Sequence, residues 1–160
     1  MKNKILTWDE YFMSLSHLSG KRSKDPSTQV GACIVNQNKR IVGLGYNGMP
    51  YGCNDDEYPW EREGDFMNTK YAYVVHAELN AILNSTAPLK NCSIYVSLFP
   101  CNECAKAIIQ SGITEVVYES DKYAEIFDQL SVKVSKKMFE SAGVKLRQIE
   151  PIKVSIEKDN

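Results

Sequence analysis

The chain has 160 residues, of which 43% are apolar and 24% charged, and its formal net charge is −1 at pH 7. This length and composition are typical of a globular protein, so we expect a single domain over residues 1–160. The near-neutral charge argues against a nucleic-acid partner, and no apolar run approaches the ~20 residues of a membrane span, which argues against a membrane partner. Five cysteines, an odd number, do not favour a disulfide framework, which predicts a reducing, cytoplasmic setting.

The N-terminal region predicts an amphipathic helix. Apolar side chains recur at steps of three and four residues between Trp8 and Ser19. Thr7 and Glu10 fit a capping box at the start of this helix, and Gly20 is the expected stop at its end.

Two strands are predicted after this helix. Residues 30–35 and 41–46 are short apolar runs, and the polar residues 36–40 between them suit a hairpin loop. Both strands contain glycine, which weakens an isolated strand. We therefore expect either backbone or a ligand to approach these glycines closely.

The segment from Asn47 to Gly52 interrupts the sheet. Its Asn-Gly and Pro-x-Gly steps are turn signals in their own right, so a plain turn without a ligand is one interpretation. Residues 53–65 show no clear period, and a loop of this length in a small domain is usually functional or disordered. Tyr58 and Trp60 favour an ordered loop.

The second half of the chain alternates helices with strands. The apolar patterns and the turn residues predict, in order, a helix over 75–83, a strand over 93–98, a helix over 102–111, a strand over 115–118, a helix over 123–142 and a strand over 144–149. Such alternation predicts an α/β sheet with helices on both faces.

Two short motifs in this second half indicate chemistry. His76-Ala77-Glu78 supplies an imidazole and a carboxylate, and Pro100-Cys101-Asn102-Glu103-Cys104 supplies two thiols. One histidine and two cysteines suit a tetrahedral Zn²⁺ ion whose fourth position stays open for water, as in catalytic zinc sites. Glu78 lies too close in sequence to His76 to be an obvious ligand. We therefore predict one catalytic zinc ion per chain on these three donors, with Glu78 as the group that moves protons.

Each motif also has a simpler interpretation. A C-x-x-C pair can be a redox pair or half of a structural zinc knuckle, and a single histidine on an apolar face is usually a core residue. Each of these explains one motif and leaves the other as a coincidence. The two motifs together, H-x-E followed by P-C-x-x-C, are the pattern of zinc nucleobase deaminases, in which the glutamate is a proton shuttle and not a ligand.

Both motifs are expected at helix starts, where loops leave the carboxyl ends of strands. The helix dipole there favours thiolates over thiols, and Pro100 ends its strand and fixes the direction of the chain towards both sulfurs. Glu78 would take a proton from the attacking water, pass it to N3 of a pyrimidine and then protonate the leaving amino group.

At this point the chain resembles the deoxycytidylate (dCMP) deaminases of the cytidine-deaminase-like superfamily. Beyond the two motifs, the similarity includes Lys24-Asp25-Pro26, Val30-Gly31-Ala32, Gly45-Tyr46-Asn47-Gly48-Met49-Pro50, Ser111-Gly112-Ile113 and Ser120-Asp121-Lys122-Tyr123, and it extends to about Glu150. The resemblance implies a three-layer α/β/α sandwich around a five-stranded mixed sheet. It implies hydrolysis of dCMP to dUMP and ammonia, which feeds thymidylate synthesis.

The resemblance also implies binding residues. Substrate contacts are expected from Asn47, Ala77 and Tyr123. An allosteric nucleotide site, activated by dCTP and inhibited by dTTP with Mg²⁺ on the triphosphate, is expected at Lys24, Asn47, Gly48, Pro50 and Gly52. The phosphate candidates are Arg22, Lys24 and Lys122, although exposed basic residues are often only solvated surface. A homo-oligomer, a hexamer, is typical of the family, and some relatives contain a second, structural zinc whose ligands are not evident here.

Three alternatives remain open from the sequence. A tRNA or polynucleotide deaminase would share the zinc site but would need a basic surface. Deaminases of other small molecules, such as dCTP, cytidine or guanine, would share most of the remaining features. A regulatory nucleotide-binding protein would require an inert Glu78.

Overall fold

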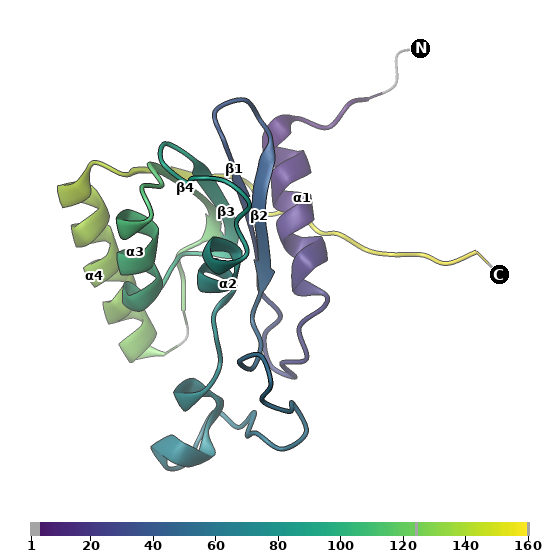
Figure 1. Cartoon of the computed structure of the whole chain (residues 1–160), viewed down its shortest axis with the longest axis vertical. Helices are drawn as coiled ribbons and strands as arrows, with labels where there is room; N and C mark the ends of the chain where they lie inside the picture. The colour runs from purple at the N-terminus through teal and green to yellow at the C-terminus, as the bar shows by residue number, and fades with distance from the viewer. Residues whose placement is uncertain (1–3, 124, 160) are drawn as a thin grey trace.

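A five-stranded mixed sheet forms the middle layer of the computed structural model, which describes residues 4–123 and 125–159 (Figure 1). The strand order is β2–β1–β3–β4–β5. The strands are β1 (Gly31–Val35), β2 (Ile41–Tyr46), β3 (Ser93–Leu98), β4 (Glu115–Ser120) and β5 (Lys145–Gln148). β1 pairs antiparallel with β2 and β3, whereas β3, β4 and β5 run parallel, which confirms the expected mixed sheet.

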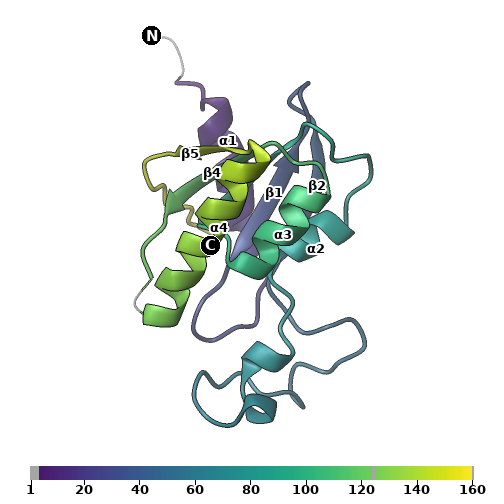
Figure 2. The same cartoon turned by 90° about the vertical axis from the view of Figure 1, so that its left-hand side faces the viewer.

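Helices cover both faces of this sheet, which confirms the three-layer α/β/α fold (Figures 1 and 2). One face is covered by α1 (Trp8–Gly20) and the other by α2 (Ala77–Leu83), α3 (Asn102–Gln110) and α4 (Ile126–Ala142). The long connection before α2 contains two short 3₁₀ turns, Phe66–Asn68 and Lys70–Ala72, and extends beyond one end of the sheet. Among the described residues no helix is long and apolar enough to cross a membrane.

The strand β1 shows why the sheet is buried on both sides. All five of its residues are buried, and its side chains alternate between two apolar clusters. Ala32 and Ile34 belong to the cluster under α2, α3 and α4, whereas Cys33 and Val35 belong to the cluster under α1. The continuous apolar run of this strand therefore reflects burial on both faces.

The predicted capping box of α1 is present, and the helix ends at Gly20 as predicted. Thr7 and Glu10 exchange the two hydrogen bonds of the box, at 3.1 and 2.9 Å. Gly20 is the last residue of the helix and not its cap, because the C-cap is Lys21. A Cβ atom at Gly20 would lie 2.9 Å from the backbone N of Gly31, so the missing side chain lets the helix end approach β1.

The strand glycines have the same explanation. A Cβ atom at Gly45 would lie 2.3 Å from the backbone N of Ala81 in α2. The close approach expected at the strand glycines is therefore a contact with backbone, and it lets α2 lie directly on β2. This packing fixes the start of α2, where His76 and Glu78 are found.

Two predicted helix starts differ from the structure, whereas the predicted ends of α1 and α3 are each within one residue of the observed ends. α2 begins at Ala77 with His76 as its N-cap, two residues later than predicted. α4 begins at Ile126, whereas the prediction began at residue 123 and included Ala124. Residues 1–3, Ala124 and Asn160, which the predicted single domain includes, lie outside the described residues.

Candidate metal centre

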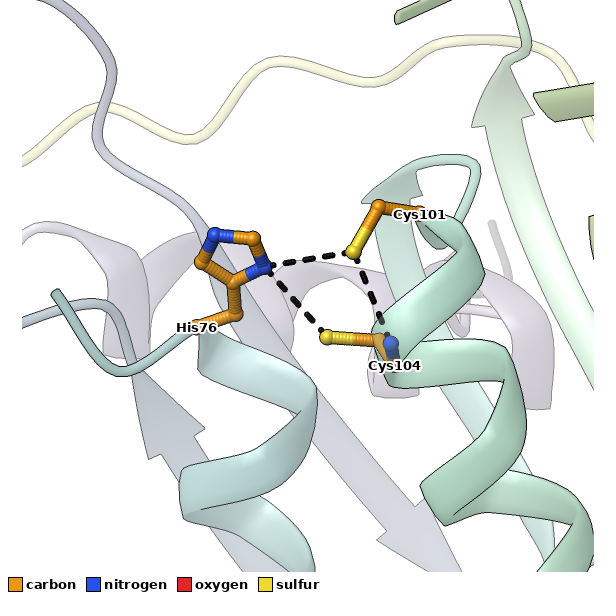
Figure 3. Close-up of side chains that lie close together, drawn as sticks. All are labelled: His76, Cys101 and Cys104. Carbon is orange, nitrogen blue, oxygen red and sulfur yellow. Dashed lines mark hydrogen bonds between the residues drawn. The ribbon is translucent and has the colours of Figure 1, made fainter. Parts of the chain in front are cut away.

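Three donor atoms from two helix starts converge on one point. The Nδ1 atom of His76 lies 3.5 Å from the Sγ atom of Cys101 and 3.4 Å from that of Cys104 (Figure 3). All three donor atoms lie within 4.8 Å of one another. Within residues 4–123 and 125–159 this is the only group of three or more histidine, cysteine or acidic side chains with such spacing.

The spacing fits a zinc ion. With Zn–N near 2.0–2.1 Å and Zn–S near 2.3 Å, two ligands of a tetrahedral ion lie about 3.5 Å apart. The two N···S distances of this cluster agree with that value. Three protein donors leave one tetrahedral position for water or substrate, as in catalytic zinc sites.

The local fold brings the two sulfurs together. β3 ends at Leu98, and after the Phe99–Pro100 turn Cys101 is the N-cap of α3, with extended backbone angles. Its Sγ atom accepts the backbone N–H of Cys104 at 3.5 Å. The N-cap and the first turn of the helix therefore present both sulfurs on the same side, towards His76.

The electrostatics of the cluster favour a thiolate. The side-chain interaction with the Cys104 thiol is the main cause that lowers the pKa of Cys101 to about 4, and His76 and the backbone N–H of Cys104 act in the same direction. The hydrogen bond with Cys101 raises the pKa of His76 to about 9, and the same thiolate together with burial raises the pKa of Cys104. Because Zn²⁺ binds thiolates and neutral imidazole, Cys101 is already deprotonated for the metal at neutral pH, whereas His76 and Cys104 each release a proton when the metal binds.

Glu78 lies beside the donors without belonging to them. It occupies the first turn of α2 and is only 6% exposed. Burial raises the pKa of its carboxyl group to about 6, and the positive charge of His76 opposes this rise. A carboxyl group with such a pKa can accept and release a proton near neutral pH.

Asn47 and Gly48, which the sequence placed in a turn, join the chain after β2 to two other segments, the loop before β1 and the residues before α2. The side-chain oxygen of Asn47 accepts the backbone N–H of Val30 at 2.9 Å, and its amide donates to the carbonyl of Thr28 at 3.0 Å. Gly48 exchanges two backbone hydrogen bonds with Val75, at 3.1 and 2.8 Å. This bridge holds the residue just before His76.

The remaining residues proposed for the substrate lie near the cluster. Ala77 is 1% exposed and belongs to the core. The hydroxyl of Tyr123 donates to the carbonyl of Phe99 at 2.7 Å. Burial raises the pKa of Tyr123, and the charges of Glu78 and Cys101 raise it further.

The residues expected to bind nucleotide phosphates lie on the surface. Lys24 forms an exposed ion pair of 2.9 Å with Asp55, and Arg22 and Lys122 are exposed. Pro50 is half-buried, and Gly52 is exposed with a φ of +89°. A cavity of about 370 Å³ opens next to Lys24 and is lined also by Asp55 and Asp56.

A larger cavity of about 880 Å³ lies between three segments of the chain. Its walls are Ser27, the loop 60–63 with Tyr71, and the start of α4 at Glu125, Phe127 and Asp128. Four carboxylates and only one guanidinium line it. This cavity alone therefore does not suit a phosphate group.

One buried ion pair could not be predicted from any pattern in the sequence. The Nζ atom of Lys70 lies 2.7 Å from Oδ2 of Asp25, and the two side chains are 9% and 1% exposed. Oδ1 of the same carboxylate accepts the backbone N–H groups of Ser27 and Thr28. The pair therefore joins the segment that precedes α2 to the loop that precedes β1, and both segments line the large cavity.

Comparisons with known proteins agree with this site. The chain matches the family described as "Cytidine and deoxycytidylate deaminase zinc-binding region" over residues 6–120. It is 55% identical to the deoxycytidylate deaminase of Mus musculus, with 94% of this chain and 84% of that protein covered. The corresponding protein of Homo sapiens is 54% identical with the same coverage. A crystal structure of the dCMP deaminase from cyanophage S-TIM5, in complex with dCMP and dUMP, superposes with a TM-score of 0.69 at 26% identity, with 92% of this chain and 100% of that chain covered.

The buried pair predicts an asymmetric effect of mutation on stability. Lys70→Met leaves the carboxylate of Asp25 buried without a cation, so we expect a loss of about 3–5 kcal/mol in the free energy of unfolding. The double variant Asp25→Asn/Lys70→Met removes both charges and should lose less than Lys70→Met alone. Urea denaturation of the zinc-saturated protein measures both values.

Lys145→Met is the matched control for this prediction. Lys145 is 69% exposed and its Nζ atom lies 3.8 Å from Glu115, so its loss should cost less than about 1 kcal/mol. Equal losses in Lys70→Met and Lys145→Met would contradict the prediction.

Proposed function

The chain belongs to the cytidine and deoxycytidylate deaminase family, and we propose that it is a zinc-dependent enzyme that hydrolyses dCMP to dUMP and ammonia. The observation that supports this most directly is the convergence of one imidazole and two thiols beside a buried carboxyl group. The identity of 55% to a deoxycytidylate deaminase over most of the chain supports the choice of substrate.

His76, Cys101 and Cys104 are the proposed ligands of one zinc ion per chain. When bound, the metal supplies a water molecule whose pKa is lowered towards about 7, and it acts as a Lewis acid. The low pKa of the Cys101 thiol supports this assignment, because the ligand has to be deprotonated.

Glu78 is the proposed proton carrier. Its carboxylate takes a proton from the attacking water and delivers it to N3 of the cytosine ring, which makes C4 more electrophilic. After the oxygen of the water has added to C4, the same carboxylate takes the remaining proton from this oxygen and gives it to the 4-amino group. The C4–N bond then breaks, the C4=O double bond forms, and the amino group leaves as ammonia. The burial of Glu78 keeps bulk water from competing for this proton.

We propose that Asn47, Ala77 and Tyr123 orient the nucleotide. For Tyr123 the family resemblance suggests a contact near the phosphate end of the nucleotide, and its hydrogen bond to the turn before Cys101 supports a place beside the metal centre. The amide of Asn47 is already engaged with Thr28 and Asp25, so a contact with the deoxyribose would use the free lone pair of its side-chain oxygen. Arg22, Lys24 and Lys122 are the proposed cations for the phosphate.

We further propose an allosteric nucleotide site at Lys24, Asn47, Gly48, Pro50 and Gly52, with dCTP as activator and dTTP as inhibitor. The small cavity beside Lys24 supports this, because Asp55 and Asp56 offer oxygen ligands to a Mg²⁺ ion that also binds a triphosphate. Within residues 4–123 and 125–159, and apart from Gly48 and its two chain neighbours, no heavy atom lies within 4 Å of a Cβ atom built on Gly48, which leaves room for a nucleotide.

We propose that the enzyme is a single domain that assembles into a homo-oligomer, a hexamer. It would act in the cytoplasm, where it supplies dUMP for thymidylate synthesis. Ile126, Leu130 and Val134 of α4 support self-association, because they are 79%, 53% and 47% exposed at four-residue spacing on one helix face. A nucleic acid is not a proposed partner, since the net charge of −1 provides little attraction for a polyanion.

Substrate choice is tested by ammonia release from dCMP, dCTP, deoxycytidine, cytidine, guanine and single-stranded DNA or RNA. We expect dCMP to be the best substrate by at least tenfold in kcat/KM. Preferential turnover of a polynucleotide would favour a nucleic-acid deaminase instead. Preferential turnover of dCTP or a nucleoside would indicate a small-molecule deaminase with a different substrate.

The role of Glu78 predicts a separation of metal binding from turnover. Glu78→Gln should retain one zinc ion per chain and lose turnover by about 10³-fold or more, because the amide cannot carry the proton. Steady-state kinetics and metal analysis measure the two properties. A loss of less than about tenfold would rule out the shuttle.

Zinc stoichiometry tests the ligand assignment. The purified protein should contain one zinc ion per chain, and Cys104→Ser should lower this content. Removal of the metal by a chelator should abolish turnover, and added Zn²⁺ should restore it. Two zinc ions per chain would reveal a second site.

The allosteric site predicts that dTTP lowers dCMP turnover and that Mg²⁺ enhances this inhibition, whereas dCTP has the opposite effect. Lys24→Met should weaken both responses through loss of a phosphate contact. Turnover that is indifferent to both triphosphates would leave residues 47–52 as a structural turn.

A further inference from the structure

We infer that Ser131 and Ser135 of α4 are positioning residues for the two thiols of the metal centre and thereby set its metal affinity. This inference rests on the zinc site proposed above. It concerns the turn from Phe99 to Asn102, which connects β3 to α3 and contains Cys101.

Ser135 holds this turn immediately before the first thiol. Its side chain is 0% exposed, and its Oγ atom donates to the carbonyl oxygen of Pro100 at 2.8 Å. A serine inside a helix commonly bonds a carbonyl of its own preceding turn, so a bond to another segment is a tertiary contact. Pro100 is itself buried, and its carbonyl would lose this partner if the hydroxyl were removed.

Ser131 holds the turn between the two thiols. Its Oγ atom accepts the backbone N–H of Asn102 at 2.8 Å and donates to the side-chain oxygen of the same residue at 2.8 Å. Asn102 is the first residue of α3, and its N–H group has no partner within the helix. Ser131 is 6% exposed, so water does not readily replace it.

The two hydroxyls act from the same face of α4, because residues four apart lie one turn above each other on a helix. A third hydroxyl, that of Tyr123, donates to the carbonyl of Phe99. The groups on both sides of Cys101 are therefore bonded to residues 123–135, and α4 lies against α3 (Figure 2). This arrangement fixes the thiols with respect to His76, which is held by a different helix.

The simplest alternative is that these serines only stabilise the fold. Ser16 provides a matched control, since it is also 0% exposed and its Oγ atom donates to a backbone carbonyl, that of Gly31, at 2.6 Å. It lies in α1, on the opposite face of the sheet from the metal centre. Loss of the Ser16 hydroxyl and loss of the Ser135 hydroxyl should lower stability by similar amounts. Of these two residues, only Ser135 contacts the turn that contains Cys101.

The test is a comparison of metal affinity in Ser131→Ala, Ser135→Ala and Ser16→Ala. Each metal-free protein is titrated with Co²⁺, whose thiolate charge-transfer and d–d absorption report the geometry of the ligands. Zn²⁺ affinity is measured by competition with a chelator. Unfolding by urea is measured on the same metal-free samples, so that stability and metal affinity are compared directly.

We expect Ser131→Ala and Ser135→Ala to bind Zn²⁺ about 10–100-fold more weakly than the parent protein, with altered Co²⁺ spectra. Ser16→Ala should stay within about twofold in affinity and keep the parent spectrum, even where its stability falls as much. If Ser135→Ala does not fold, Ser131→Ala tests the inference by itself.

Parent-like affinity and spectra in both α4 variants would overturn the inference, and so would an equal loss of affinity in Ser16→Ala. Failure of the proposed function has a different result. In that case the parent protein itself would show no thiolate absorption with Co²⁺.

Discussion

The distance between two helix starts is the constraint on which this structure depends. His76 precedes α2 and Cys101 precedes α3, and their donor atoms have to lie about 3.5 Å apart to share a tetrahedral ion. The sheet provides this proximity because α2 packs on β2 through the missing side chain of Gly45, and α3 follows β3 across a short turn. Close backbone packing, and not the donor residues alone, therefore determines the geometry of the site.

Buried polar contacts supply the rigidity that this geometry needs. The loops around the site contain few helices or strands, so few backbone hydrogen bonds hold them. Hydrogen bonds and an ion pair from side chains hold these loops instead. Asn47 and the Lys70–Asp25 pair join the loops before β1 and α2, and the hydroxyls of α4 hold the turn before α3. Because an unpaired buried polar group is costly, such contacts favour one arrangement of the loops over others.

The sequence predicted the order of the elements and the donor set, because both depend on local patterns. Apolar spacing and capping residues gave the strands and most helix limits, and the H-x-E and P-C-x-x-C motifs gave the three donors. Contacts between distant segments could not be predicted. Gly20 resembled a local helix stop but serves a contact with β1, and the partners of Lys70 and Ser135 lie 45 and 35 residues away in sequence. The spacing of apolar residues along the chain does not indicate such contacts between distant segments.

The separation of the donors along the chain has a consequence for biosynthesis. His76 leaves the ribosome 25 residues before Cys101, and the segment between them includes β3, which pairs with β1. A nascent chain that ends before Cys104 lacks a donor, so it cannot hold the ion in this way. The complete donor set therefore exists only after α3 has begun to be synthesised.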